Sequence, residues 1–241
     1  PPVAPLGRLE ALSFLASTKA PWRFLELAKA TQSQVFRIRM PLPLDLFIVG
    51  APGLIREICS DITSDKSIQF YTPIDAVTGG PNIFTRSSRD PHWKTARKKT
   101  ALAFSSHEVH RMNRICHEHV DNWIKTFLGP IADTKQTFDP SHEMAKLTFH
   151  IIMESAFEYK ATDAEFEHVN KHFEIALREY STKQALNSLR KVFGRFILEV
   201  QRALASCNEL ITFATHLLKS YHDNRSKSAQ NTVIKLIDGL E

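Results

Sequence analysis

The chain has 241 residues, of which 43% are hydrophobic, and this is enough apolar material for one large domain or two small ones. The formal net charge of +5 is mild, so composition neither demands nor excludes a nucleic-acid partner. The sequence holds only 8 glycines and 3 cysteines, which predicts a mostly helical protein without a disulfide framework, in a reducing compartment.

The two ends of the sequence lack the features of natural termini. It starts PPVAPLG without a methionine, and it stops at VIKLIDGLE inside an apparent helix. We therefore expect an internal segment of a longer protein, in which any signal or membrane anchor upstream of Pro1 is not visible. No apolar run of about 18 residues occurs, so no transmembrane helix is predicted within this stretch.

Short elements are predicted in the N-terminal quarter. After an extended, proline-rich start, residues 22–31 have helical spacing. Residues 35–40 and 44–50 predict two strands of a hairpin, and the prolines between them favour an edge position. Another helix is predicted at 51–59, and the polar residues 60–81 predict a long loop with at most one short turn of helix.

Beyond residue 90 the pattern is helical almost throughout. The longest apolar stripe, from residue 193 to 218, predicts a helix of about seven turns, followed by a polar loop at 221–231. No internal repeat or linker interrupts the pattern, so one helical domain that opens with a small sheet is predicted. Helix starts are marked by two Asp-Pro pairs and two capping boxes: Asp90-Pro91, Asp139-Pro140, Ser105-x-x-Glu108 and Thr162-x-x-Glu165.

Common catalytic and metal motifs are missing from the sequence. The phosphate-binding glycine loops and the G-x-S-x-G element of hydrolases do not occur. His168 and His172 are four residues apart, but no H-E-x-x-H follows and no cysteine pair has ligand spacing. We therefore expect no metal site among these side chains.

The stretch NIFTRSSRDPHWKTARKKTALAFS, residues 82–105, mixes cations with aromatic side chains. On a helix that starts at Pro91, Arg97 lies about 40° from Trp93 and Phe104 about 20° from it, so the three share one stripe. An indole N–H beside a guanidinium suits a buried carboxylate or phosphate. The alternative is that the tryptophan is part of the core and the arginine extends to solvent. The lysines of this helix face other directions: Lys94, Lys98 and Lys99.

The same stretch resembles the C-helix region of cytochrome P-450 haem-thiolate monooxygenases, in which W-x-x-x-R is followed by a Phe eleven residues after the Trp. Residues 22–40 resemble the first helix and first strand of that family, and 44–59 the second strand and next helix. The resemblance implies a mainly α fold with a small N-terminal β-sheet. It also implies that residues 1–241 are the N-terminal part of a single domain, with helices A to about H and the first hairpin, and that the C-terminal haem-ligand half lies outside them.

The resemblance implies roles for particular residues. Trp93 and Arg97 would bind the haem propionates, and an acidic electron-donor protein, a reductase or a ferredoxin, would dock on Lys94, Lys98 and Lys99. Four residues are candidates for the roof of a pocket for an apolar small-molecule substrate: Phe70, Tyr71, Ile83 and Phe84.

The activity implied by the resemblance is the insertion of one oxygen atom from O₂ into an apolar organic substrate. The thiolate loop of the family, F-x-x-G-x-x-x-C-x-G, surrounds none of the three cysteines, so we expect no catalytic residue or metal ligand here and no activity of this segment alone. A non-catalytic truncated relative that binds partners through its helices is the alternative, and a nucleic-acid module is disfavoured. The endoplasmic reticulum membrane, on its cytoplasmic face, is favoured over a soluble cytoplasmic location.

Overall fold

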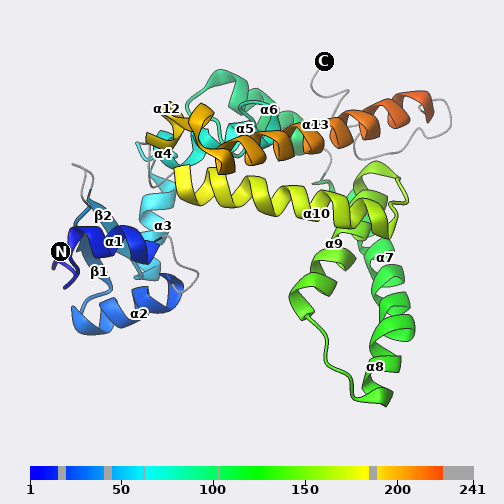
Figure 1. Cartoon of the computed structure of the whole chain (residues 1–241), viewed down its shortest axis with the longest axis horizontal. Helices are drawn as coiled ribbons and strands as arrows, with labels where there is room; N and C mark the ends of the chain where they lie inside the picture. The colour runs from blue at the N-terminus through cyan, green and yellow to red at the C-terminus, as the bar shows by residue number, and fades with distance from the viewer. Residues whose placement is uncertain (16–19, 41–44, 62, 102–103, 185–188, 225–241) are drawn as a thin grey trace.

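The computed structural model describes residues 1–15, 20–40, 45–61, 63–101, 104–184 and 189–224 (Figure 1). It is mainly helical with one small antiparallel sheet, which confirms the predicted fold class. None of the described helices is long and apolar enough to cross a membrane.

The N-terminal lobe is built on the predicted hairpin. Strands β1 (Val35–Ile38) and β2 (Leu46–Val49) pair antiparallel, with Val35 opposite Val49. The extended start of the chain adds to the other side of β1, because the backbone N–H of Ala4 donates to the carbonyl oxygen of Arg37 at 2.8 Å. The prolines at 41 and 43, which favoured an edge position, lie outside the described residues. Helices α1 (Arg8–Leu15) and α2 (Ala20–Ala30) cover a core of Ala4, Ala11, Leu27, Phe36 and Ile38.

Residues 60–81 are more helical than the sequence predicts. After α3 (Pro52–Ser60), this segment forms α4 (Ile68–Tyr71), the 3₁₀ turn η1 (Thr72–Ile74) and α5 (Asp75–Thr78). Gly79 ends α5 in the left-handed region at φ 74°, a conformation that glycine adopts without a steric penalty. These short helices form because Val77 is buried in a core cluster with residues of two distant helices.

The remaining helices follow the predicted starts closely. The long helix begins at Leu198, later than the apolar stripe, because Phe196 belongs to the 3₁₀ turn before it and Phe193 precedes that turn. The bounds are α6 Pro91–Ala101, α7 Ser106–Trp123, the π-helical turn η3 Ile124–Leu128, α8 Gly129–Thr134, α9 Pro140–Phe157, α10 Asp163–Leu177, the π-helical turn η4 Arg178–Lys183, α12 Leu189–Val192, the 3₁₀ turn η5 Gly194–Phe196 and α13 Leu198–Asn224.

Three of the four predicted caps form. Asp90 and Asp139 accept the backbone N–H two residues on, at 2.8 and 2.9 Å, and Thr162 closes a complete capping box with Glu165. The box predicted at Ser105 is wrong, because the Ser105 side chain makes no cap bond and the Glu108 side chain is buried instead. A salt bridge of 3.1 Å from Glu108 to Arg111 replaces the cap bond.

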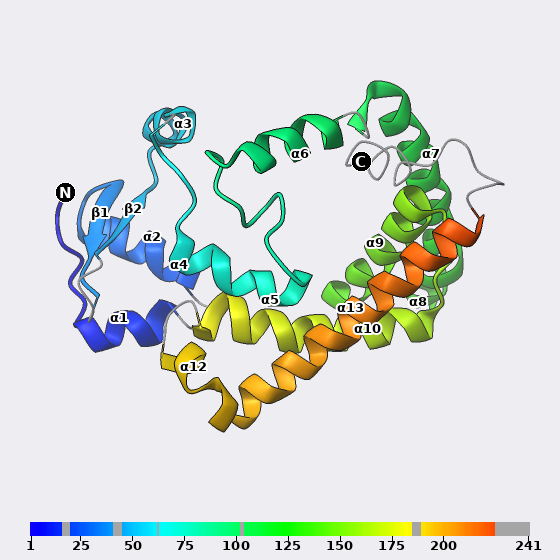
Figure 2. The ribbon, with the colours of Figure 1, turned by 90° about the horizontal axis from the view of Figure 1, so that it is seen from above.

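Helices α10 and α13 pack along each other and form the second core, with Ala176, Tyr180, Ala203 and Cys207 around Val77. Figure 2 shows α4 and α5 next to α10, and α6 set apart from α10 and α13 at the end of a loop. Helix α6 is therefore positioned mainly by the loop between Thr78 and Pro91, which connects it to α5.

Candidate functional site

Helix α6 is fixed at its start by local bonds. Asp90 caps the helix and also pairs with Arg86, at 3.1 Å between carboxylate and guanidinium. Both interactions lower the pKa of Asp90, the bond from the backbone N–H of His92 most strongly. None of the described residues of α6 is fully buried, so the side chains of this helix are at least partly accessible to solvent.

Trp93 points its donor at the loop that leads into its own helix. The indole Nε1–H donates to the carbonyl oxygen of Ile83 at 2.7 Å, and the side chain is partly buried. The ammonium group of Lys66 donates to the same oxygen at 3.0 Å and to the carbonyl oxygen of Arg86 at 3.1 Å. It lies 5.3 Å from the centroid of the indole ring, a distance at which a cation is attracted to the ring face.

Asp65, the neighbour of Lys66, ties the same loop down from the other side. Its carboxylate accepts from the backbone N–H of Ser88 at 3.0 Å, from the Ser88 hydroxyl at 3.1 Å and from the hydroxyl of Ser87. These bonds stabilise the charged form and hold the pKa of Asp65 well below its usual range, with the Ser87 bond the largest cause. Asp65 and Lys66 therefore connect the segment before α4 to the segment before α6 through hydrogen bonds.

The sequence did not reveal the roles of Asp65 and Lys66. Both residues lie in the polar segment 60–81, and each bonds residues about 20 positions away along the chain. No spacing rule links residues at that separation, so only their charges in a polar loop could have drawn attention to them.

Arg97 lies one turn after Trp93 and is exposed. Among the described residues, no side chain forms a hydrogen bond or ion pair with its guanidinium. Lys94 and Lys98 are exposed as well, as the wheel predicts. The predicted stripe therefore carries a guanidinium with free donors beside an indole whose donor is already used.

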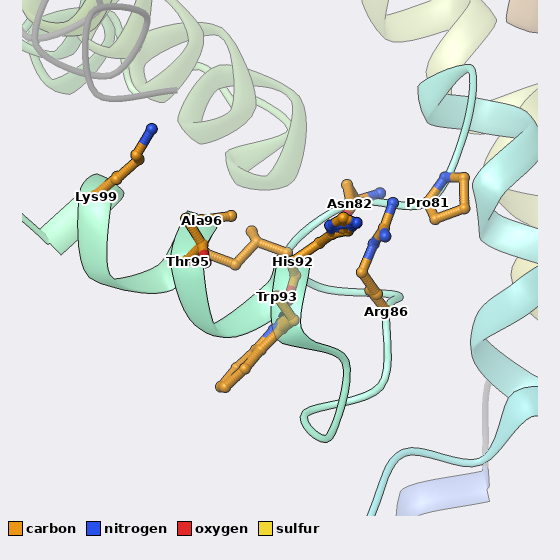
Figure 3. Close-up of a pocket in the computed structure, with 9 residues that line it drawn as sticks. Pro81, Asn82, Arg86, His92, Trp93, Thr95, Ala96 and Lys99 are labelled. Carbon is orange, nitrogen blue, oxygen red and sulfur yellow. Dashed lines mark hydrogen bonds between the residues drawn. The ribbon is translucent and has the colours of Figure 1, made fainter. Parts of the chain in front are cut away.

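Lys99 lies on a different side of the helix from the other two lysines. It borders a hollow of about 320 Å³ between α6 and the loop before it, together with His92, Thr95 and Ala96, as Figure 3 shows. These four residues follow the i, i+3, i+4, i+7 spacing of one helical face, so the sequence contained the signal that separates Lys99 from Lys94 and Lys98.

The four predicted pocket residues are not brought together. Ile83 borders the hollow next to Trp93, whereas Phe84 points to solvent with 77% of its surface exposed. Phe70 and Tyr71 lie in α4, away from the hollow, and Tyr71 is 38% exposed. The sequence therefore identified apolar side chains on two segments, and the structure does not join them in one wall.

The three cysteines lie in different surroundings. Cys59 is exposed, Cys116 is partly buried, and Cys207 is buried in the core between α10 and α13. Burial raises the pKa of the Cys207 thiol, which disfavours the thiolate form. Within the ranges that the structure describes, no group of His, Cys, Asp or Glu residues could hold a metal ion.

Comparison with known proteins decides the family. The profile of the cytochrome P450 family matches residues 1–240. The chain belongs to the cytochrome P450 family. Both the resemblance inferred from the sequence and the mainly α fold with a small sheet are thereby confirmed.

Two relatives are named as bifunctional proteins. The bifunctional cytochrome P450/NADPH–P450 reductase 1 of Bacillus subtilis (strain 168) is 24% identical over 158 residues, which are 64% of this chain and 14% of that protein. The bifunctional cytochrome P450/NADPH–P450 reductase of Bacillus cereus is 25% identical over the same shares. The chain thus aligns with a small part of the length of both relatives.

Family membership does not by itself test the residue roles. Trp93 and Arg97 as partners of the P450 cofactor, and the pocket and docking residues, stay predictions, as does the extent of the domain. In this structure the indole N–H of Trp93 is bonded to the Ile83 carbonyl oxygen, so this hydrogen bond must break or become bifurcated before the N–H can donate to another acceptor.

Proposed function

We propose that this chain is part of a haem-dependent monooxygenase that inserts one oxygen atom from O₂ into an apolar organic substrate. The observation that carries the proposal is the family match over residues 1–240, which includes the W-x-x-x-R helix. When bound, haem supplies the iron chemistry that activates oxygen, while the chain holds, orients and shields the group.

The donor set around α6 fits the carboxylates of haem. Arg97 offers an exposed guanidinium, and the indole N–H of Trp93, one turn away on the same helix, would exchange its bond to the Ile83 carbonyl oxygen for one to a propionate. A guanidinium can bind a carboxylate through two parallel bonds, and each charge-assisted bond contributes about 1.5–3 kcal/mol. We therefore assign the two haem propionates to Trp93 and Arg97.

The apolar residues before α6 fit the substrate side. Ile83 borders the hollow next to Trp93, and Phe84 exposes most of its ring, so a hydrophobic ligand could bury apolar surface of both side chains. Phe70 and Tyr71 would contribute from α4 if that segment borders the same ligand. These exposed apolar side chains predict a substrate whose part next to the ring of Phe84 is apolar and uncharged.

Electron delivery is assigned to the exposed face of α6. Lys94 and Lys98 lie there without a carboxylate partner among the described residues, so an acidic surface could approach them. The Bacillus relatives are named as fusions with an NADPH–P450 reductase, which supports a reductase as the donor. Lys99 was predicted to share this role, and its place at the hollow makes it the weakest of the three candidates.

The proposal is tested by haem retention in the full-length protein. Arg97→Ala removes the exposed guanidinium, and we expect haem affinity to fall by about tenfold or more, in line with one lost charge-assisted bond. Lys94→Ala, which removes a cation from the same helix, serves as the control and should retain haem. The readout is the ratio of haem to polypeptide after purification, and equal ratios for Arg97→Ala, Trp93→Phe and wild type would overturn the assignment.

A second candidate function is a non-catalytic helical protein that binds partners. Large apolar side chains on several described elements are mostly exposed, among them Leu9 at 77%, Trp22 at 73% and Ile68 at 79%. Such surface is typical of a chain that is covered by further protein. Titration of the haem-free full-length protein with haem separates the candidates, because a purely interacting relative would show no saturable binding.

A further inference from the structure

A charged cluster joins the end of α10 to the start of α13. Arg190 binds Glu179 through two bonds, Nε to Oε1 at 2.9 Å and Nη2 to Oε2 at 2.8 Å, and its Nη2 also donates to Glu199 at 2.9 Å. Lys183 completes the cluster with a bond of 2.7 Å to the same oxygen of Glu199. The bond with Glu179 is the largest cause that raises the pKa of Arg190, and the bond from Lys183 is the largest cause that lowers the pKa of Glu199.

The members of the cluster differ greatly in burial. The Glu179 side chain is only 3% exposed and Arg190 19%, whereas Glu199 is 57% exposed. A buried carboxylate is stable only while its oxygens are bonded, and Arg190 supplies a bond to each of them. Glu179 and Arg190 therefore form the more buried part of the cluster, and partly buried Lys183 links to it through the exposed Glu199.

Glu179 lies in the π-helical turn η4, where the regular α-helical bonding of α10 is interrupted. Single π turns inside helices occur often at functional positions, because the extra residue turns side chains to new directions. Here the turn directs Glu179 toward Arg190, and the next residue, Tyr180, toward Val77 of α5 in the second core.

The short segment after Arg190 is fitted closely to α13. A Cβ atom added at Gly194 would lie 3.0 Å from Cγ1 of Val200, so only glycine allows this approach without a shift. The side-chain amide of Gln201 donates to the carbonyl oxygen of Gly194 at 3.2 Å. These contacts with α13 fix the segment that follows Arg190, so the guanidinium of Arg190 has a defined position from which it binds Glu179.

On its other side η4 touches the segment that carries two predicted pocket residues. The 3₁₀ turn η1 packs against η4, and α5 packs against both α10 and α13. Figure 2 shows α4 and α5 alongside the C-terminal part of α10, with α4 nearer to its end. A displacement of η4 would therefore be transmitted to Ile68–Thr78, where Phe70 and Tyr71 lie.

We propose that Arg190 is a positioning residue, which by pinning Glu179 in the π turn fixes the segment Ile68–Thr78. Its consequence for substrate selection rests on the proposed function, since it requires Phe70 and Tyr71 to face the substrate. The positioning itself requires neither haem nor substrate.

The test is amide hydrogen exchange of the full-length protein, followed by mass spectrometry of a peptide that covers residues 68–78. In Arg190→Met we expect exchange of this peptide to accelerate at least about tenfold, with partial recovery in Arg190→Lys, which keeps the charge and loses the two-bond geometry. Lys183 is bonded to the exposed Glu199 and not to Glu179, so Lys183→Met should exchange at the wild-type rate. A peptide that covers residues 35–49 of the N-terminal sheet should stay unchanged and thereby exclude global loosening.

Faster exchange confined to residues 189–198 in Arg190→Met would overturn the proposal, and so would equal acceleration by Lys183→Met. If Arg190→Met does not fold, Glu179→Gln tests the same link, because it keeps the size of the side chain and removes its charge. The haem-retention experiment on Arg97 is independent of these measurements, so either assignment can fail while the other stands.

Discussion

Helix α6 and the pair α10–α13 treat their polar groups in opposite ways. In the described part of α6 no residue is buried, and Arg97, Lys94 and Lys98 face outward. The second core, by contrast, buries Ala176 and Cys207, and beside it the carboxylate of Glu179 is matched with Arg190. The pair α10–α13 matches these charges within the chain, whereas α6 leaves Arg97, Lys94 and Lys98 without a side-chain partner among the described residues. The difference is what is expected of a supporting scaffold and of a surface that receives a ligand or partner.

The strongest test of this difference between the two regions is to remove the partner of the buried Glu179 carboxylate. We expect Arg190→Met to lower the free energy of unfolding by about 3 kcal/mol, at the lower end of the range for broken buried ion pairs because Arg190 is partly exposed. Urea unfolding of the full-length protein measures the change. Lys183→Met is the matched control and should have a much smaller effect, and equal losses from the two variants would show that burial does not separate these pairs.

Two predicted capping boxes provide a second test, because they share the motif of a Ser or Thr followed three residues later by Glu, while their observed bonds differ. Thr162→Ala should destabilise by about 1 kcal/mol, because Thr162 accepts the N–H of Glu165 at 3.2 Å. Ser105→Ala should change stability by no more than about 0.5 kcal/mol, since Ser105 makes no cap bond. Thermal unfolding of both variants decides this, and a larger loss for Ser105→Ala would contradict the observed caps.

The α6 region should respond more weakly to the loss of an internal bond. Trp93→Phe removes the donor to the Ile83 carbonyl oxygen, and we expect a loss of about 0.5–1 kcal/mol because the site is only partly buried. The same change should accelerate amide exchange in residues 82–90. If stability fell as far as in Arg190→Met, α6 would be a structural core element and the contrast between the regions would disappear.

The smallest effect is expected from pH. His142, on α9, bonds Glu167 of α10 and its neighbour Glu143, and the Glu167 bond most strongly raises its pKa above the usual 6.5. A raised pKa in the folded state contributes stability that is full below pH 6.5 and is lost as the pH rises through the folded-state value. We therefore expect His142→Gln to reduce the fall in melting temperature above pH 6.5. Identical curves for wild type and His142→Gln would refute the prediction.

The sequence predicted well wherever the deciding groups lie within a few residues. The caps at Asp90, Asp139 and Thr162 and the hairpin formed as expected. Helix α6 begins at Pro91 as predicted, but Phe104 lies outside the described helix and is 63% exposed. The prediction failed at Ser105, where Glu108 had a competing partner in Arg111. Residues 60–81 also formed helices that their polar composition did not suggest, because Val77 reached a core made by distant helices.

The candidate site divides in the same manner. The order of Trp93 and Arg97 on one stripe follows from helix geometry, and so does the placement of Lys99 on another face. The use of the Trp93 donor by Ile83, and the hydrogen bonds made by Asp65 and Lys66, depend on how two loops meet. No periodicity in the sequence encodes such a meeting.

The sequence by itself determined the helical class, most helix starts and the family, because these depend on propensities, caps and motifs that act over one or two turns. Only the tertiary structure decided which polar groups are used within the chain and which remain exposed. Glu179 is paired with a residue 11 positions away across a π turn, whereas the guanidinium of Arg97 has no partner within the described ranges. The physical reason is that burial, and with it the energy of an ion pair or hydrogen bond, is set by the segments that pack together and not by neighbours in sequence.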